Sequence, residues 1–116
     1  MKVIIAGSRD IHRHVTWLDR HIVESRFDVT HVLEGGARGI DRLGREWAKQ
    51  MNVPFTTYKA DWSSYGRSAG LRRNAVMAMN ADALIAIWDG KSNGTRNMIE
   101  LMERQGKPVH VVRIDN

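Results

Sequence analysis

The sequence contains no cysteine, and its 116 residues include only two prolines. Without cysteine the chain can form no disulfide, no thiolate metal site and no cysteine nucleophile. Its longest strongly apolar run, residues 83–88, is far shorter than the roughly 18 residues that a membrane-spanning helix needs. The apolar run at residues 1–6 is also shorter than the hydrophobic segment of a signal peptide. We therefore expect a cytoplasmic protein that does not bind a membrane.

The rest of the composition is that of an ordinary folded domain. Hydrophobic residues make up 42% and charged residues 27% of the chain, which argues against a disordered, collagen-like or coiled-coil protein. The length is that of one domain, which we expect to cover residues 1–116. The net charge is +5, and arginine outnumbers lysine among the 18 basic residues. Because the guanidinium fork matches phosphate and carboxylate groups, this basic protein is expected to bind an anionic partner.

Short apolar runs alternate with amphipathic stretches along the whole chain. Strand-length runs rich in β-branched residues cover residues 2–6, 29–33, 54–58, 83–88 and 109–114. Apolar residues recur at helical spacing over residues 11–22, 40–51, 69–80 and 98–102. Strands that alternate with helix-length connections form parallel sheets with right-handed crossovers. The sequence therefore predicts an α/β fold, a single three-layer Rossmann-like domain with a five-stranded parallel sheet.

The segments that follow the predicted strands hold most of the glycines and much of the positive charge. They are residues 7–10, 35–41, 59–74 and 89–96. In parallel sheets, ligands bind at the carboxyl ends of the strands, where these segments converge. Glycine allows close backbone approach, helix N-termini offer free N–H groups, and arginine supplies charge-assisted hydrogen bonds. Together they predict a phosphate-binding loop region, although glycines also end strands in α/β proteins that bind no phosphate.

Three of these segments carry specific candidates. Gly7-Ser8-Arg9 directly follows the first strand, but the full Gly-x-Gly-x-x-Gly fingerprint is missing, which disfavours a dinucleotide-dependent dehydrogenase. Gly35-Gly36-Ala37-Arg38-Gly39-Ile40-Asp41 opens the second helix, where Asp41 either caps backbone N–H groups or accepts a ribose hydroxyl. Asn93-Gly94-Thr95 opens the last helix, where it either binds phosphate or acts as a plain N-cap.

Aromatic residues and histidines are further candidates for ligand contacts. Trp62 and Tyr65 lie among hydroxyl and cationic side chains in the segment 61–67, which we expect to be a loop. They could stack on a base, whereas Trp62 could equally pack beneath its own loop. The five histidines show no metal-ligand spacing, so we predict no metal site, and the sequence identifies no cofactor.

A set of short motifs occurs in order over nearly the whole chain. The set is Gly7-Ser8-Arg9, Gly-Gly-Ala-Arg-Gly-Ile-Asp at 35–41, Trp47-Ala48, Ala-Asp-Trp at 60–62, Tyr65-Gly66, Ala69-Gly70, Arg73-Asn74, Met77, Ala81-Asp82 and Gly94-Thr95. Together these motifs resemble the YspA-related family of the SLOG superfamily. The resemblance implies a Rossmann-like fold and a nucleotide or nucleotide-derived ligand. Relatives include the Lonely Guy phosphoribohydrolases, which release a base from a nucleoside 5'-monophosphate, and the DNA-processing protein DprA.

The resemblance to the Lonely Guy enzymes implies roles for single residues of this chain. Arg73 with Met77 resembles their Arg-Lys-x-x-Met segment, in which the arginine serves the active site, and Asn74 replaces the lysine. Gly94-Thr95 resembles the second half of their phosphate-binding turn. Their catalytic glutamate corresponds to Met98, which cannot transfer protons. This difference favours binding over catalysis, although Asp41 or Asp10 could supply a carboxylate.

The leading hypothesis is a protein that binds a nucleotide or nucleotide-derived small molecule at the carboxyl edge of the sheet, as a sensor or a nucleotide-processing protein. The predicted ligand-binding residues are Gly7, Ser8, Arg9, Gly35, Gly36, Arg38, Gly39, Asp41, Arg73, Asn74, Gly94 and Thr95. One alternative is a domain that binds single-stranded DNA, and another is a nucleoside 5'-monophosphate N-glycosidic hydrolase. By analogy with the superfamily we also expect a homo-oligomer. The apolar residues of the last two helices, including Met77, Met79, Met98 and Met102, leave room for an interface between helices, but a core can absorb them equally well.

Overall fold

The computed structural model describes residues 1–115. Its five strands are β1 (Lys2–Gly7), β2 (His31–Glu34), β3 (Phe55–Thr57), β4 (Ala83–Trp88) and β5 (Val109–Arg113). They form one sheet in the order β3-β2-β1-β4-β5, and every pair of neighbours is parallel. The predicted five-stranded parallel sheet is confirmed.

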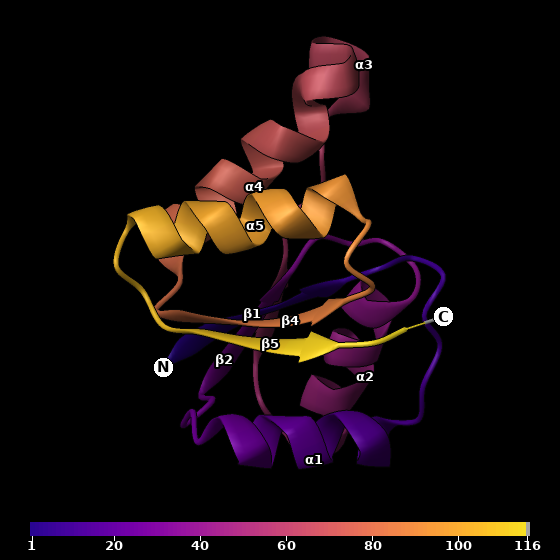
Figure 1. The fold of residues 1–116 in the computed structure, drawn as a ribbon, viewed down its shortest axis with the longest axis vertical. Coiled ribbons are helices and arrows are strands. Elements are labelled where there is room, and N and C mark those ends of the chain that lie inside the picture. The colour runs from indigo at the N-terminus through magenta and orange to yellow at the C-terminus, as the bar shows by residue number, and fades with distance from the viewer. Residues whose placement is uncertain (116) are drawn as a thin grey trace.

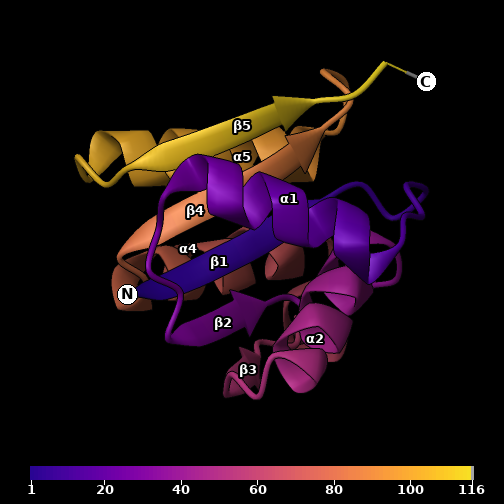
Figure 2. The same ribbon diagram turned by 90° about the horizontal axis from the view of Figure 1, so that it is seen from below.

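Helices cover both faces of this sheet. One face carries α1 (Val15–Ser25) and α2 (Ile40–Gln50), and the other carries α4 (Ala69–Asn80) and α5 (Asn93–Arg104), as Figure 1 shows. Viewed from below, α1 and α2 lie in front of the strands (Figure 2). The short helix α3 (Trp62–Tyr65) and a 3-10 turn (Gly66–Ser68) extend beyond the start of α4 at the top of Figure 1. The arrangement is the predicted three-layer Rossmann-like fold.

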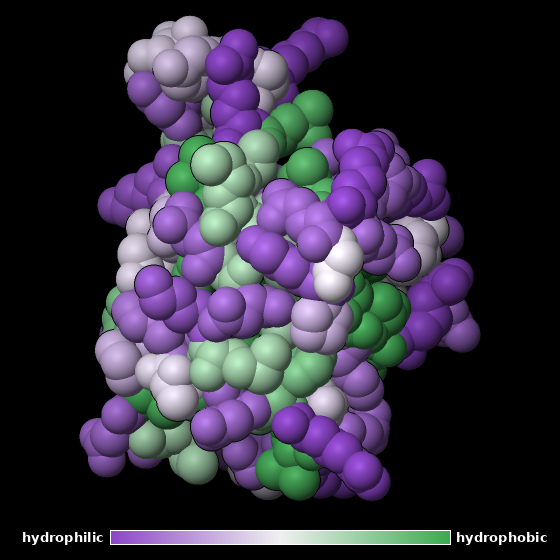
Figure 3. Space-filling view, turned by 90° about the vertical axis from the view of Figure 1, so that its left-hand side faces the viewer, coloured by the Kyte–Doolittle hydropathy of each residue, from purple (hydrophilic) through white to green (hydrophobic). Residues whose placement is uncertain are grey.

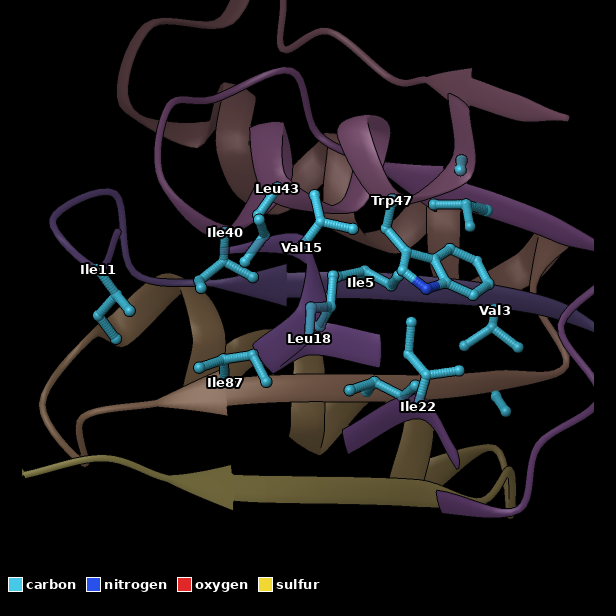
Figure 4. Packing of buried hydrophobic residues seen from close by; sticks show 14 residues of the cluster. Val3, Ile5, Ile11, Val15, Leu18, Ile22, Ile40, Leu43, Trp47 and Ile87 are labelled. Atoms are coloured by element: carbon cyan, nitrogen blue, oxygen red, sulfur yellow. The ribbon is translucent and has the colours of Figure 1, made fainter. Parts of the chain in front are cut away.

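Two hydrophobic clusters hold the layers together. Between the sheet and the pair α1 and α2, Ile5, Leu18 and Trp47 point toward one another (Figure 4). On the opposite face, Ile4 and Leu84 pack against α4 and α5. Residues 83–87 of β4 are all buried, which explains the continuous apolar run because this strand is covered on both faces. Each fully buried aliphatic side chain contributes roughly 1.5–3 kcal/mol to the hydrophobic stabilisation.

Some boundaries differ from those expected. The segment 61–67 is helical over Trp62–Tyr65, because the Asp61 carboxylate accepts a hydrogen bond from the Ser64 N–H at 3.2 Å and caps the turn. The first helix starts at Val15 rather than Ile11, since the His14 side chain caps it, and Ile11 is nevertheless buried. Strand β2 starts at His31, two residues after the expected start, and continues to Glu34.

The sheet has a topological switch point between β1 and β4. The chain leaves β1 toward α1 on one face and leaves β4 toward α5 on the other. In parallel sheets, ligands bind at the carboxyl ends of the strands on either side of such a point. Gly7 ends β1 at this point. A Cβ on Gly7 would lie 2.5 Å from the Ile87 carbonyl oxygen and 2.8 Å from Ile40 Cγ1. Only glycine permits so close an approach of β1, β4 and the start of α2.

Candidate functional site

A cavity of about 450 Å³ opens at the switch point, and we call it the switch-point cavity. It lies where the loops that follow β1 and β4 meet the residues of α2 and α4. Its lining is formed by Ala6, Gly7, Ser8, Arg9, Asp10, Ala37, Asp41, Arg73, Asn74, Met77, Asp89, Lys91, Ser92, Gly94, Thr95 and Met98. Its volume lies within the range of roughly 300–1,000 Å³ that is typical of small-molecule sites.

Most of the predicted ligand-binding residues meet in this cavity. They are Gly7, Ser8, Arg9, Asp41, Arg73, Asn74, Gly94 and Thr95. Gly35, Gly36 and Arg38 instead line a neighbouring cavity. Gly39 lines neither of these two cavities. Its φ is +74°, and a Cβ added there would overlap the backbone of Ser8 and Arg9. The structure thus brings together residues from four separate segments.

The start of α5 presents backbone donors to the switch-point cavity. The helix is capped by Ser92, whose Oγ accepts hydrogen bonds from the Thr95 N–H at 3.4 Å and from the Thr95 hydroxyl at 3.1 Å. The N–H groups of Asn93 and Gly94 belong to the first turn and have no acceptor within the helix. Gly94 lines the cavity, and a Cβ added to it would have no atom within 4 Å.

The loop before α5 is fixed by Asp89. Its Oδ1 accepts hydrogen bonds from the Ser92 and Lys91 N–H groups, each at 2.8 Å. These backbone hydrogen bonds lower the pKa of Asp89. The carboxylate therefore stays ionised and holds the loop in place at neutral pH.

Asp41 combines a structural contact with a position in the cavity wall. Its Oδ2 accepts a hydrogen bond from the Ala37 N–H at 3.2 Å, and the residue is only 7% exposed. Burial raises the pKa of Asp41 to about 6, while the Ala37 N–H acts in the opposite direction. The negative charge of Glu34 adds to the increase, and the positive charge of Arg73 lowers it. Asp41 can therefore gain or lose a proton near neutral pH.

Arg73 and Asn74 connect the loops on the two sides of the switch point. Arg73 donates from Nη1 to the carbonyl oxygens of Gly35 at 2.6 Å and Tyr58 at 3.3 Å, and from Nε to Asn74 Oδ1 at 3.0 Å. Asn74 donates from Nδ2 to the Gly94 carbonyl at 3.2 Å. Burial lowers the pKa of Arg73, but a guanidinium remains protonated in proteins. The result is a cation held in a fixed orientation beside the cavity.

Glu34, at the end of β2, was not among the predicted site residues. It is fully buried, and its Oε1 accepts hydrogen bonds from the Gly36 N–H and Arg45 Nη1, each at 2.7 Å. The Thr57 hydroxyl donates to its other oxygen. Through its hydrogen bond from the Gly36 N–H, Glu34 fixes the Gly35-Gly36 turn. In the sequence, Glu34 directly follows the apolar run 29–33, and this position could have identified it as a candidate site residue.

The four methionines that were candidate interface residues differ in burial. Met98 is 1% exposed and lines the switch-point cavity, so a thioether lies where the resemblance places a glutamate. Met77 also lines this cavity, and Met102 is buried in the hydrophobic cluster between the sheet, α4 and α5. Met79 alone of the four candidate interface residues is exposed, at 74%.

The neighbouring cavity, which we call the basic cavity, has a volume of about 440 Å³. It is lined by Arg9, Gly35, Gly36, Ala37, Arg38, Lys59, Ala60, Trp62 and Arg73. Arg9, Ala37 and Arg73 line both cavities, which are therefore adjacent. Tyr65 lines neither of them, and Arg72 covers its ring at 4.3 Å from the ring centroid.

The described residues, 1–115, offer neither a metal site nor a membrane-spanning helix. In this part of the chain, no group of three or more His, Asp or Glu side chains is arranged to hold a metal ion. None of its helices is both long enough and apolar enough to cross a membrane.

Comparisons with known proteins agree with this architecture. The family model described as the YspA, cpYpsA-related SLOG family matches residues 1–65, which include the loops after β1 and β2. The Gene 61 protein of Mycobacterium phage D29 is 35% identical over 122 residues, and the match covers 93% of each chain. DNA processing protein A (DprA) from Streptococcus pneumoniae is similar in fold, with a TM-score of 0.77 at 16% identity. That match covers 98% of this chain but 50% of the DprA chain.

Proposed function

The chain belongs to the YspA, cpYpsA-related SLOG family, and from this premise we propose that it binds a nucleotide or nucleotide-derived small molecule in the switch-point cavity. The convergence of Ser8, Arg73 and the start of α5 on one cavity carries the proposal. A phosphoryl group there would meet free N–H groups at Gly94, the positive end of the α5 dipole and the Arg73 guanidinium.

The remaining wall suits the sugar of such a ligand. Asp41 lines the same cavity as Gly94, and its carboxyl group can accept a hydrogen bond from a ribose hydroxyl. Met77 and Met98 supply an apolar surface next to these polar groups. Most of the other lining residues are polar or charged, so these two side chains form the main apolar part of the cavity.

The experiment is thermal unfolding of the whole chain with nucleoside monophosphates, nucleoside diphosphates, NAD, ADP-ribose and a short single-stranded oligonucleotide at two salt concentrations. A small-molecule ligand at about 100 times its Kd adds roughly 2.7 kcal/mol to the free energy of unfolding. We expect a rise in Tm with one nucleotide class that persists at the higher salt concentration. If no nucleotide raises Tm, the proposal is wrong.

Single-stranded DNA is the second candidate ligand. The basic cavity and the exposed indole of Trp62 favour it, because single strands bind to cationic grooves in which bases stack on aromatic rings. DprA, which shares the fold, is by its name a DNA-processing protein. This function predicts that only the oligonucleotide raises Tm and that the effect fades at higher salt.

Hydrolysis of a nucleoside 5'-monophosphate is the alternative enzymatic function. The thioether of Met98 cannot stabilise an oxocarbenium-like centre, and Asp41 is the buried carboxyl group of the same cavity. We therefore propose binding without cleavage, as in a nucleotide sensor. Chromatographic detection of free base after incubation with each monophosphate tests this, and release that is lost in Asp41→Asn would establish the hydrolase instead.

A further inference from the structure

The two cavities differ in their charges. The switch-point cavity contains Asp10, Asp41 and Asp89 as well as cations, whereas the basic cavity contains cations and, among residues 1–115, no carboxylate in its lining. Its cations are Arg9, Arg38, Lys59 and Arg73. Like charges that line one cavity repel one another, and a bound anion would relieve this repulsion. Burial lowers the pKa of Arg73, the negative charge of Asp41 opposes this decrease, and the positive charge of Arg9 adds to it.

The cations of the basic cavity are positioned by the surrounding chain. The Lys59 stem lies against Gly36, since a Cβ on that glycine would be 3.6 Å from Lys59 Cγ. Arg38 forms an exposed ion pair with Asp10 at 3.1 Å. Arg73 is fixed by its hydrogen bonds to Gly35 and Tyr58. Arg73 and the Lys59 stem are therefore positioned beside the cavity before any ligand arrives.

Trp62 lines the basic cavity. Its ring lies over Gly70 of α4, where a Cβ would be 3.5 Å from Trp62 Cη2, and the residue is 53% exposed. The cavity is therefore bounded by an aromatic face and lined by cations, and it shares the wall of Arg9, Ala37 and Arg73 with the switch-point cavity.

We infer that the basic cavity is a second phosphoryl subsite, and that the ligand is a nucleoside diphosphate or a compound containing one. The inference rests on the proposed function, because the first phosphoryl group occupies the switch-point cavity. The second phosphoryl group lies in the adjacent basic cavity. There Lys59, Arg38 and Arg9 donate charge-assisted hydrogen bonds to it.

The test compares four nucleoside monophosphates with the matching diphosphates by isothermal titration calorimetry. The measured quantity is the ratio of the monophosphate Kd to the diphosphate Kd for the same base. We expect a ratio of about tenfold or more in the wild type, which is the factor that about 1.4 kcal/mol from an additional charge-assisted contact gives. In Lys59→Gln we expect the ratio to fall toward one. Lys49→Gln is the matched control, since it removes the same charge from an exposed position on α2 and leaves the ratio unchanged.

Each outcome identifies a separate failure. If monophosphate and diphosphate bind equally, or if Lys59→Gln weakens both by one factor, the second subsite does not exist while the proposed function stands. If neither binds, the proposed function fails as well. If affinity for oligothymidylate grows with length well beyond that for the diphosphates, the basic cavity belongs to a nucleic-acid surface and the inference is overturned.

Discussion

Arg73 donates a hydrogen bond to the carbonyl oxygen of Gly35 at 2.6 Å, across 38 positions of sequence. This contact joins α4 to the turn that follows β2 on the edge of the sheet where both cavities open. The same guanidinium lines both cavities. Arg73 therefore serves the fold and the proposed site at once, and its substitution should affect both.

Arg73→Ala is expected to weaken nucleotide binding by roughly 1.5–3 kcal/mol, as for the loss of a charge-assisted hydrogen bond. It should also lower Tm, because the carbonyl of Gly35 loses its charged donor. Calorimetric Kd values and thermal unfolding measure the two effects. Arg104→Ala is the control, since Arg104 is an exposed partner of Glu100 on α5 and its removal changes stability by no more than about 0.5 kcal/mol. Wild-type affinity in Arg73→Ala would exclude the guanidinium from the site.

Gly35→Ala tests the same contact from the other side. An added Cβ would overlap Arg73 Nη1 and lie 2.9 Å from Asp41 Oδ2, so two cavity residues must move. We expect a loss of roughly 1–3 kcal/mol in the free energy of unfolding and weaker nucleotide binding. Gly94→Ala is the contrasting variant for stability, since its Cβ meets nothing within 4 Å and alanine favours a helix. Equal stability of the two variants would contradict the packing around Gly35.

The layer arrangement was predictable because hydrophobic periodicity reports burial directly. The apolar run of β4 and the amphipathic pattern of α2 each gave the correct element. The helix at Trp62–Tyr65 was not predicted, since its formation depends on one capping carboxylate, Asp61, in a polar segment. Local hydrogen bonds of this kind leave little trace in hydrophobic patterning.

The candidate site was predictable to the extent that strand ends converge on one edge. Gly7, Arg73 and Thr95 follow from this rule and do meet in one cavity. Gly35 and Gly36 line a second cavity, and Arg73 contacts this turn through the Gly35 carbonyl. The spacing of residues in the sequence does not predict this long-range contact. The burial of Glu34 likewise depends on distant partners, and acidic residues are rarely fully buried.

Glu34→Ala is expected to destabilise the protein by roughly 3–5 kcal/mol. The substitution removes the acceptor of Arg45, of the Gly36 N–H and of the Thr57 hydroxyl, and breaking one side of a buried ion pair is costly. Urea unfolding at pH 7 measures the change. Glu46→Ala breaks the exposed Arg42–Glu46 pair instead and should cost no more than about 0.5 kcal/mol. Similar losses in the two variants would refute a structural role specific to Glu34.

Self-association should depend on the exposed side of α4. Leu71, Val76 and Met79 are 52%, 47% and 74% exposed, and Figure 3 shows hydrophobic surface below the lobe that α3 forms at the top. We expect the wild type to form a dimer through this face and Met79→Glu to be monomeric, because each copy would bring a charge into an apolar interface. Light scattering after size-exclusion chromatography measures the mass. A monomeric wild type would contradict the prediction, and Met51→Glu, at an exposed position outside α4, is the control.

Asp41→Asn should change the pH dependence of stability. Burial raises the pKa of Asp41 from 3.8 to about 6, so the folded protein retains a proton that the unfolded chain has lost between these pH values. Stability must then decrease as pH rises from about 4 to 6 and stay lower above that range. Asparagine keeps an acceptor for the Ala37 N–H without the charge. The variant should therefore be more stable than the wild type at pH 7.5, by up to roughly 3 kcal/mol.

The difference in the free energy of unfolding between Asp41→Asn and the wild type distinguishes two opposing effects on this carboxyl group, desolvation and the attraction of Arg73. If desolvation dominates, the advantage of the variant disappears by about pH 4, where both folded and unfolded wild type approach the protonated state. If the attraction of Arg73 dominated instead, the ionised carboxylate would stabilise the fold and the variant would be less stable at pH 7.5. Urea unfolding at pH 4, 6 and 7.5 decides between them. The first result would mean that the cavity holds a destabilised carboxylate, which a ribose hydroxyl could relieve by donating a hydrogen bond, so nucleotide affinity should then fall in Asp41→Asn.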